Sequence, residues 1–210
     1  MRQKKNSIFV IGDSISIHYG PYLEIYLKNG FTYSRKTGED GLIDLDNPRG
    51  ANGGDSSMVL EYLRGDPPFN RPDFLLVNCG LHDLKTDPDS GKKQIPINRY
   101  RENLEKIAVA AQTAAGQMVW IRSTPVHDET HQSKGKPFNR YNQDVIRYNR
   151  TADEVMREHG IPAIDLYGFT INIEENLYCD HVHFTIPVRK LQAAYIAGWI
   201  TGFSPAGNTG

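Results

Sequence analysis

The chain of 210 residues has only two cysteines, almost no net charge and no long apolar run. Lysine and arginine number 24 against 25 aspartates and glutamates, which gives a net charge of -1. Without a basic excess, nothing attracts nucleic acid or an anionic membrane surface. No apolar stretch approaches the roughly 20 residues that a membrane helix needs. We therefore expect a soluble protein with a small or neutral partner, without nucleic-acid binding or membrane insertion.

The two cysteines, Cys79 and Cys179, lack the paired spacing of a structural zinc site. Both lie in or beside apolar segments, so we expect two buried free thiols. A disulfide would require that they face each other across neighbouring strand ends, and the sequence leaves this open.

The first residues contain a basic cluster at 2–5 that could suggest a secretory signal. Polar Asn6 and Ser7 follow it, and then an apolar run that ends at Ile11 before charged Asp13. This run is typical of a buried strand and too short for a signal peptide. The expected location is cytoplasmic as the sequence stands, and periplasmic or secreted if a signal peptide was removed.

Short apolar runs alternate with longer helical patterns, which predicts an α/β layered fold built on buried parallel strands. Residues 1–210 are long enough for one domain, with 204–210 as a frayed tail. We expect strands at 7–11, 31–34, 74–79, 118–122 and 163–166, and helices at 17–28, 57–64, 98–115, 139–159 and 187–200. The polar loops 35–50, 83–96 and 124–137 adjoin carboxyl ends of strands, the edge at which such sheets bind ligands.

Ser14 follows the first apolar strand and precedes a helix in the sequence Gly-Asp-Ser-Ile-Ser. A strand-to-helix turn exposes a hydroxyl beside outward-pointing amide groups, so Ser14 is a candidate nucleophile whose own N–H can bind an oxyanion. Taken alone, the same residues also suit a simple helix cap at Asp13 or Ser14. The turn is not a Gly-x-Ser-x-Gly elbow, because residue 16 is serine.

Asp180 and His183 stand three residues apart just before the last helix. One turn of chain can fold this carboxylate against the imidazole and fix its tautomer, as a general base requires. A metal site is an alternative, since Cys179 and His181 lie beside them. No second cluster completes such a site, so His181 is interpreted as an ordinary loop histidine.

Two further stretches can supply donors for a developing oxyanion. Gly54 belongs to Asn-Gly-Gly-Asp, where paired glycines allow a backbone N–H to approach another group closely, although a plain turn explains them equally well. His82, in Gly-Leu-His-Asp, emerges where the strand 74–79 ends. Its neutral imidazole can donate Nε2–H, whereas a lone histidine there is more often structural.

Read together, the four stretches resemble those of the SGNH hydrolases, the GDSL esterase/lipase superfamily, from Gly12 to His183. The resemblance implies a flavodoxin-like α/β/α fold with five parallel strands in the order 2-1-3-4-5. It also implies a catalytic set of Ser14, Asp180 and His183, with oxyanion donors from Ser14 and Gly54. The third block usually reads Gly-x-Asn-Asp, so His82 replaces an asparagine and is our hypothesis for the third donor.

The resemblance implies a serine esterase that works through an acyl-enzyme and needs no metal or organic cofactor. Its loops carry polar side chains, and tyrosine and tryptophan can stack on a sugar. We therefore expect a small-molecule or carbohydrate ester with a short acyl group, such as acetyl. The alternatives are an acyltransferase, thioesterase or lipase of the same superfamily, and a flavodoxin-like binding module without catalysis.

Overall fold

The computed structural model describes residues 5–38, 50–65, 67–133, 137–174 and 176–203. Its centre is a parallel sheet in the order β2-β1-β3-β4-β5. The strands are β1 (Asn6–Ile11), β2 (Phe31–Arg35), β3 (Phe74–Val77), β4 (Gln117–Ile121) and β5 (Ala163–Ile164). The α/β class and the strand order are therefore confirmed.

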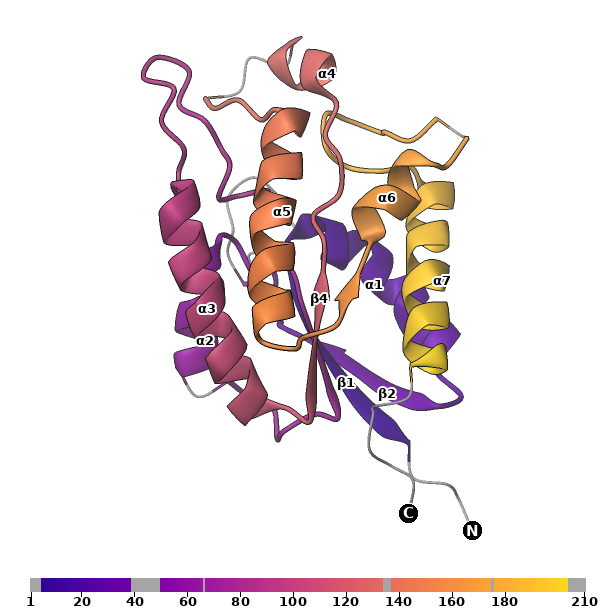
Figure 1. Cartoon of the computed structure of the whole chain (residues 1–210). Helices are drawn as coiled ribbons and strands as arrows, with labels where there is room; N and C mark the ends of the chain where they lie inside the picture. The colour runs from indigo at the N-terminus through magenta and orange to yellow at the C-terminus, as the bar shows by residue number, and fades with distance from the viewer. Residues whose placement is uncertain (1–4, 39–49, 66, 134–136, 175, 204–210) are drawn as a thin grey trace.

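Helices cover both faces of this sheet (Figure 1). On one face α1 packs against α7, and α6 packs against α7; on the other face α3 packs against both α2 and α5. The bounds are α1 (Ser14–Leu27), α2 (Ser56–Arg64), α3 (Ile97–Ala114), α4 (Asp128–Ser133), α5 (Asn142–Glu158), α6 (Leu166–Ile171) and α7 (Ile186–Gly202). Because helices cover the central strands on both faces, the residues of these strands are apolar throughout and do not alternate with polar ones.

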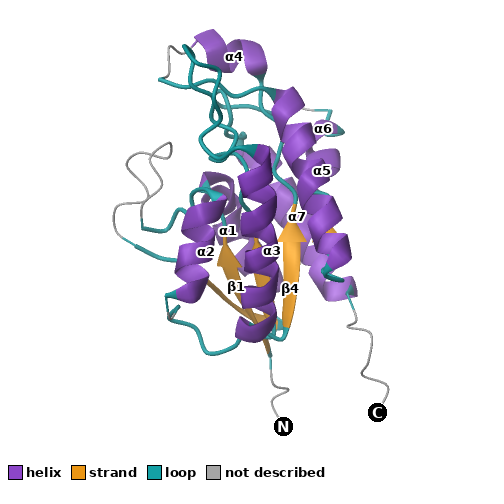
Figure 2. Ribbon diagram, turned by 60° about the vertical axis from the view of Figure 1, so that its left-hand side comes forward, coloured by secondary structure: helices purple, strands orange, loops and turns teal. Residues whose placement is uncertain are grey.

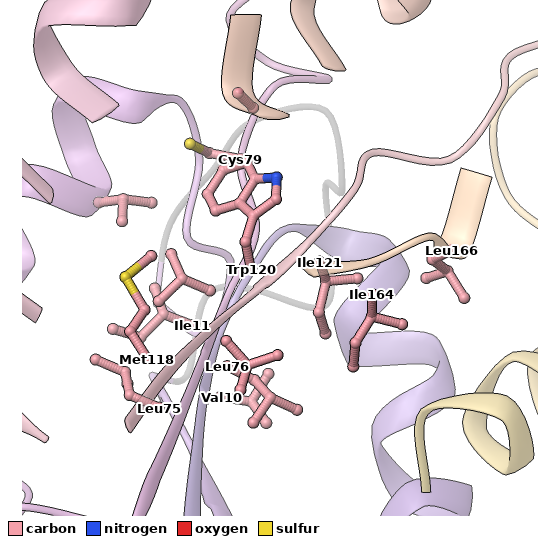
Figure 3. Packing of buried hydrophobic residues seen from close by; sticks show 14 of the residues in the cluster. Val10, Ile11, Leu75, Leu76, Cys79, Met118, Trp120, Ile121, Ile164 and Leu166 are labelled. Atoms are coloured by element: carbon pink, nitrogen blue, oxygen red, sulfur yellow. The ribbon is translucent and has the colours of Figure 1, made fainter. Parts of the chain in front are cut away.

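The core is formed by the inner strands and the helix faces that meet them. All four residues of β3 are buried, and so are the last four residues of β1. Figure 3 shows side chains of this cluster, among them Val10, Leu76 and Ile121 around the strands. Val10 pairs in register with Leu76. These continuous contacts hold the strand ends, and the loops that follow them, in fixed positions.

Several boundaries differ from those that the sequence predicts. Helix α1 begins at Ser14 rather than at 17, and α6 is a short helix that the sequence did not indicate. Helix α4 lies inside the predicted loop 124–137. Most of the predicted loop 35–50 and the tail 204–210 lie outside the described residues. Short helices such as α4 and α6 carry too little periodicity to be seen in sequence.

All strands run in parallel, so their carboxyl ends meet at one edge of the sheet. Figure 2 shows the arrows of β1 and β4 pointing toward the end of the molecule where α4 lies. Parallel sheets bind ligands at this edge. Across the described ranges, no helix is long and apolar enough to span a bilayer.

Candidate active site

Ser14 is the first residue of α1, immediately after β1 and a two-residue turn. Asp13 is the N-cap, because its Oδ1 accepts a hydrogen bond of 3.0 Å from the amide of Ile15. The alternative that Ser14 itself caps the helix is therefore excluded. Since the first amides of a helix have no partner within it, the Ser14 N–H makes no hydrogen bond inside α1.

Ser14, His183 and Asp180 form one hydrogen-bonded chain, although 169 residues separate the serine from the histidine. The distance between Ser14 Oγ and His183 Nε2 is 2.8 Å. The distance between His183 Nδ1 and Asp180 Oδ2 is 2.6 Å. A carboxylate can only accept, so Nδ1 carries the proton and Nε2 is left with a lone pair facing the serine.

The loop before α7 holds Asp180 in place through its other oxygen. Asp180 Oδ1 accepts hydrogen bonds from the amides of Val182, at 2.8 Å, and His183, at 2.7 Å. Partial burial acts to raise the pKa of Asp180, but the hydrogen bonds from His183 and the two amides outweigh it, and the net result is a lowered pKa. Asp180 is therefore an anion at every pH at which a neutral His183 can act as a base, and the two backbone amides fix its position.

The paired glycines bring a second loop against the serine turn. Gly53 donates its N–H to the carbonyl oxygen of Gly12 at 2.9 Å, and a Cβ on Gly53 would lie only 3.1 Å from that oxygen. Gly54 has a φ of 73°, in the left-handed region that glycine adopts without strain. Its N–H, expected to face an oxyanion, donates to Asn52 Oδ1 at 3.0 Å. A substrate oxygen must therefore share or replace this bond.

The family model of the GDSL-like lipase/acylhydrolases matches residues 10–186, which contain the serine, both glycines, Asp180 and His183. The chain belongs to this family. Among curated proteins, none matches it.

Solved structures from this group share the fold of our GDSL-family chain. A lipase/acylhydrolase from Enterococcus faecalis has a TM-score of 0.73 at 19% identity, with 94% of this chain and 96% of the other covered. An acetylxylan esterase from Geobacillus stearothermophilus has a TM-score of 0.69 at 14% identity, covering 97% and 98%. A G-D-S-L lipolytic protein from Veillonella parvula has a TM-score of 0.65 at 14% identity, covering 94% and 99%. These similarities show a common fold.

His82 lies in the turn that follows β3 and is only 1% exposed. Asn78, the other amide side chain of this segment, donates Nδ2 to the carbonyl oxygen of Ile121 at 2.8 Å. Because that amide is bonded to β4, Asn78 is a poor substitute for the family's asparagine, and His82 remains the candidate in this GDSL-family chain.

Asp83 joins the His82 turn to the start of α2. Both of its carboxylate oxygens accept from the amide of Ser56, at 2.9 and 3.1 Å. Asp55 caps the same helix through the amides of Ser57 and Met58. The carboxylates of Asp55 and Asp83 thus both lie at the N-terminus of α2, which is the positive end of its dipole. Asp55 directly follows Gly54. Full burial raises the pKa of Asp83 to about 7, against the hydrogen bonds from Ser56 that lower it.

We expect stability to depend on pH through Asp83. Its raised pKa means that the folded protein keeps a proton that the unfolded chain loses above its ordinary value of 3.8. The stabilising contribution is therefore complete below about pH 4 and is lost as pH rises to about 7, at up to about 1.4 kcal/mol per pH unit. Urea unfolding at pH 5 and pH 7.5 measures it. Asp83→Asn, which keeps an acceptor for Ser56, should lack this contribution. If the free energies of unfolding of the wild type and Asp83→Asn differ by the same amount at pH 5 and at pH 7.5, this expectation is wrong.

The structure corrects one expectation about the neighbouring cysteines. Cys79 is a buried free thiol, but Cys179 is exposed, because it lies in the loop before α7 rather than in a strand. His181 is buried, and its ring lies 4.7 Å from that of His131. Thr185 is the N-cap of α7 by backbone position, and its hydroxyl donates to the carbonyl oxygen of Asn176. Within the described part of the chain, no three histidines, cysteines or carboxylates are arranged to hold a metal.

Sequence reasoning missed three residues that contact the site or the start of α2, which follows Gly54. Asn52 accepts from Gly54, Asp83 holds Ser56, and His18 places its ring 4.8 Å from that of His183. Only His18 carried a usable signal, because it stands four residues after Ser14 and therefore on the same helix face.

Proposed function

We propose that this protein is a serine ester hydrolase whose nucleophile is Ser14. The observation that carries this proposal is the unbroken hydrogen-bonded chain from Ser14 Oγ through His183 to Asp180. A serine hydroxyl is a weak nucleophile unless a positioned base takes its proton. His183 is that base, and its hydrogen bond to Asp180 already sets its tautomer.

The reaction proceeds in two halves. The Ser14 Oγ forms a bond to the ester carbonyl carbon while His183 Nε2 takes the hydroxyl proton. The tetrahedral intermediate collapses as the carbon–alkoxy bond breaks, and the proton passes from His183 to the departing alcohol. Water then attacks the acyl-enzyme, gives its proton to His183, and the proton returns to Ser14 as the acid leaves. Asp180 stabilises the imidazolium in both halves.

Three donors are proposed for the oxyanion: the amides of Ser14 and Gly54, and the side chain of His82. An oxyanion is a stronger acceptor than the neutral amide oxygen of Asn52, so it competes well for the Gly54 N–H. The close contact between Gly53 and Gly12 supports this arrangement, because it brings the two backbone donors to one turn.

His82→Ala is expected to lower kcat by about 100-fold to 1,000-fold, the usual effect of removing one oxyanion donor. His82→Asn is the matched variant, since it restores the residue usual in the family and retains an N–H donor, and we expect it to keep most of the activity. Steady-state kinetics on one activated ester measures both. A wild-type kcat in His82→Ala would refute the assignment.

The substrate we propose is a short-chain ester, chiefly an acetyl ester, on a carbohydrate or another polar alcohol. Similarity in fold to an acetylxylan esterase supports this class. Tyr178, two residues before Asp180 in the sequence, is half-buried between the rings of His127, at 5.7 Å, and Phe184, at 5.1 Å, and we propose that it offers the aromatic surface for a sugar. The tryptophans do not: Trp120 is fully buried, and Trp199 stacks on Phe203 at the far end of α7.

A fluorophosphonate probe tests the nucleophile directly. We expect one covalent adduct, mapped by mass spectrometry to Ser14, and none in Ser14→Ala. Ser57→Ala, which removes a hydroxyl from the first turn of α2, serves as the control and should label like the wild type. An unlabelled wild-type protein would favour a binding module without catalysis.

An ester panel tests the substrate class. Acyl length is varied on p-nitrophenyl esters, and acetylated sugars and a thioester are measured beside them. We expect kcat/KM to fall as the acyl chain lengthens and acetylated sugars to be cleaved. A preference for long chains would indicate a lipase, and for the thioester a thioesterase. Transfer to an added sugar in preference to water would indicate an acyltransferase.

A further inference from the structure

The side chain of His18 lies directly against the proposed general base. It stands four residues after Ser14 in α1, so both side chains project from one helix face. The centroids of the His18 and His183 rings are 4.8 Å apart and the rings are tilted by 59°. Helix α1 therefore presents both the nucleophile and a neighbour for the base.

The hydrogen bonds of His183 act at the edge of its ring. Asp180 holds Nδ1 and Ser14 holds Nε2, and hydrogen bonds in the plane of the ring oppose small displacements out of that plane only weakly. Contact with the ring of His18 opposes such displacements. The ring of His181 is farther away, with its centroid 6.3 Å from that of His183. Small displacements of a catalytic group are costly to rate, so this restraint matters.

The charge state of His18 suits this place. Burial, the charge of His183 and the nearby Arg189 together lower the pKa of His18 to about 4, although Asp180 opposes them. Its Nδ1 is buried and has no hydrogen-bond partner among the described residues. A neutral ring adds no repulsion when His183 becomes an imidazolium, whereas a second cation would disfavour that state.

We propose that His18 is a positioning residue, whose uncharged ring holds the imidazole of His183 in line with Ser14 Oγ. This inference rests on the proposed function. His18 needs no proton transfer for this role, and its effect depends on the shape of the ring and its lack of charge.

The experiment compares two substitutions of His18. His18→Ala removes the ring, and we expect kcat to fall about 10-fold with KM within about 2-fold, because aromatic contacts of this kind contribute about that factor. His18→Phe keeps a neutral ring and should restore kcat to within about 3-fold of the wild type. His159→Ala, at the end of α5, is the control and should leave kcat unchanged.

Proton NMR of the free protein gives a readout that does not need turnover. The downfield resonance of the His183 Nδ1–H, which is bonded to Asp180, should broaden in His18→Ala and stay sharp in His18→Phe. If the wild type lacks esterase activity, the proposed function fails while this measurement still decides the role of His18. A wild-type kcat or an unchanged resonance in His18→Ala would overturn the proposal, and so would equal losses in both variants.

Discussion

Ser14→Ala is expected to abolish esterase turnover almost completely, lowering kcat by about 10⁵-fold to 10⁶-fold. Without the hydroxyl no acyl-enzyme forms, and His183 has no proton to take. The activity that remains is the small contribution of substrate binding and the oxyanion donors to direct attack by water. Steady-state kinetics on an activated acetyl ester, with the variant purified apart from any wild-type protein, measures the loss.

The substitution should leave the fold intact, which makes the result easy to interpret. Asp13, rather than Ser14, caps α1, and alanine suits a first helical turn. We therefore expect the Tm to stay within a few degrees. Ser57→Ala, which should retain wild-type kcat, controls for the loss of a serine hydroxyl elsewhere. Full turnover in Ser14→Ala would refute the mechanism.

Asp180→Asn is expected to lower kcat by about 10⁴-fold, although it only replaces one carboxylate oxygen by an NH2 group. The carboxylate now accepts from His183 Nδ1 at 2.6 Å and from two backbone amides. If the asparagine turns its NH2 group toward Nδ1, the imidazole must carry its proton on Nε2. The lone pair that faces Ser14 is then lost, and the imidazolium is no longer stabilised by an anion.

The kinetics of Asp180→Asn should separate this effect from lost binding. We expect KM to remain within a few-fold, because Asp180 lies behind the histidine and not against the acyl group. Labelling of Ser14 by the fluorophosphonate should slow in parallel with kcat. Asp87→Asn, a change in an exposed carboxylate that accepts hydrogen bonds from Ser90 in its own turn, should leave both rates unaltered. A kcat within 10-fold of the wild type would show that His183 does not depend on Asp180.

Local patterns predicted much of the framework. The apolar runs at 7–11 and 74–79 became β1 and β3, with ends shifted by one or two residues, because buried parallel strands must be apolar throughout. The pattern at 139–159 likewise predicted α5. The patterns failed at α4 and α6, which have only six residues each. They failed also at Cys179, since an apolar neighbourhood in sequence does not ensure burial in a loop.

For the candidate site, the sequence by itself determined which groups are present: a serine at a strand-to-helix turn, and a carboxylate three residues before a histidine. Spacing alone accounts for the Asp180–His183 contact, because one turn of chain spans it. Only the tertiary structure decided that His183 meets Ser14, that Asn52 holds the Gly54 N–H, and that His18 lies against the base. These contacts depend on how α1 and the loops meet at the sheet edge, and that geometry is set by packing of the whole core rather than by any local pattern.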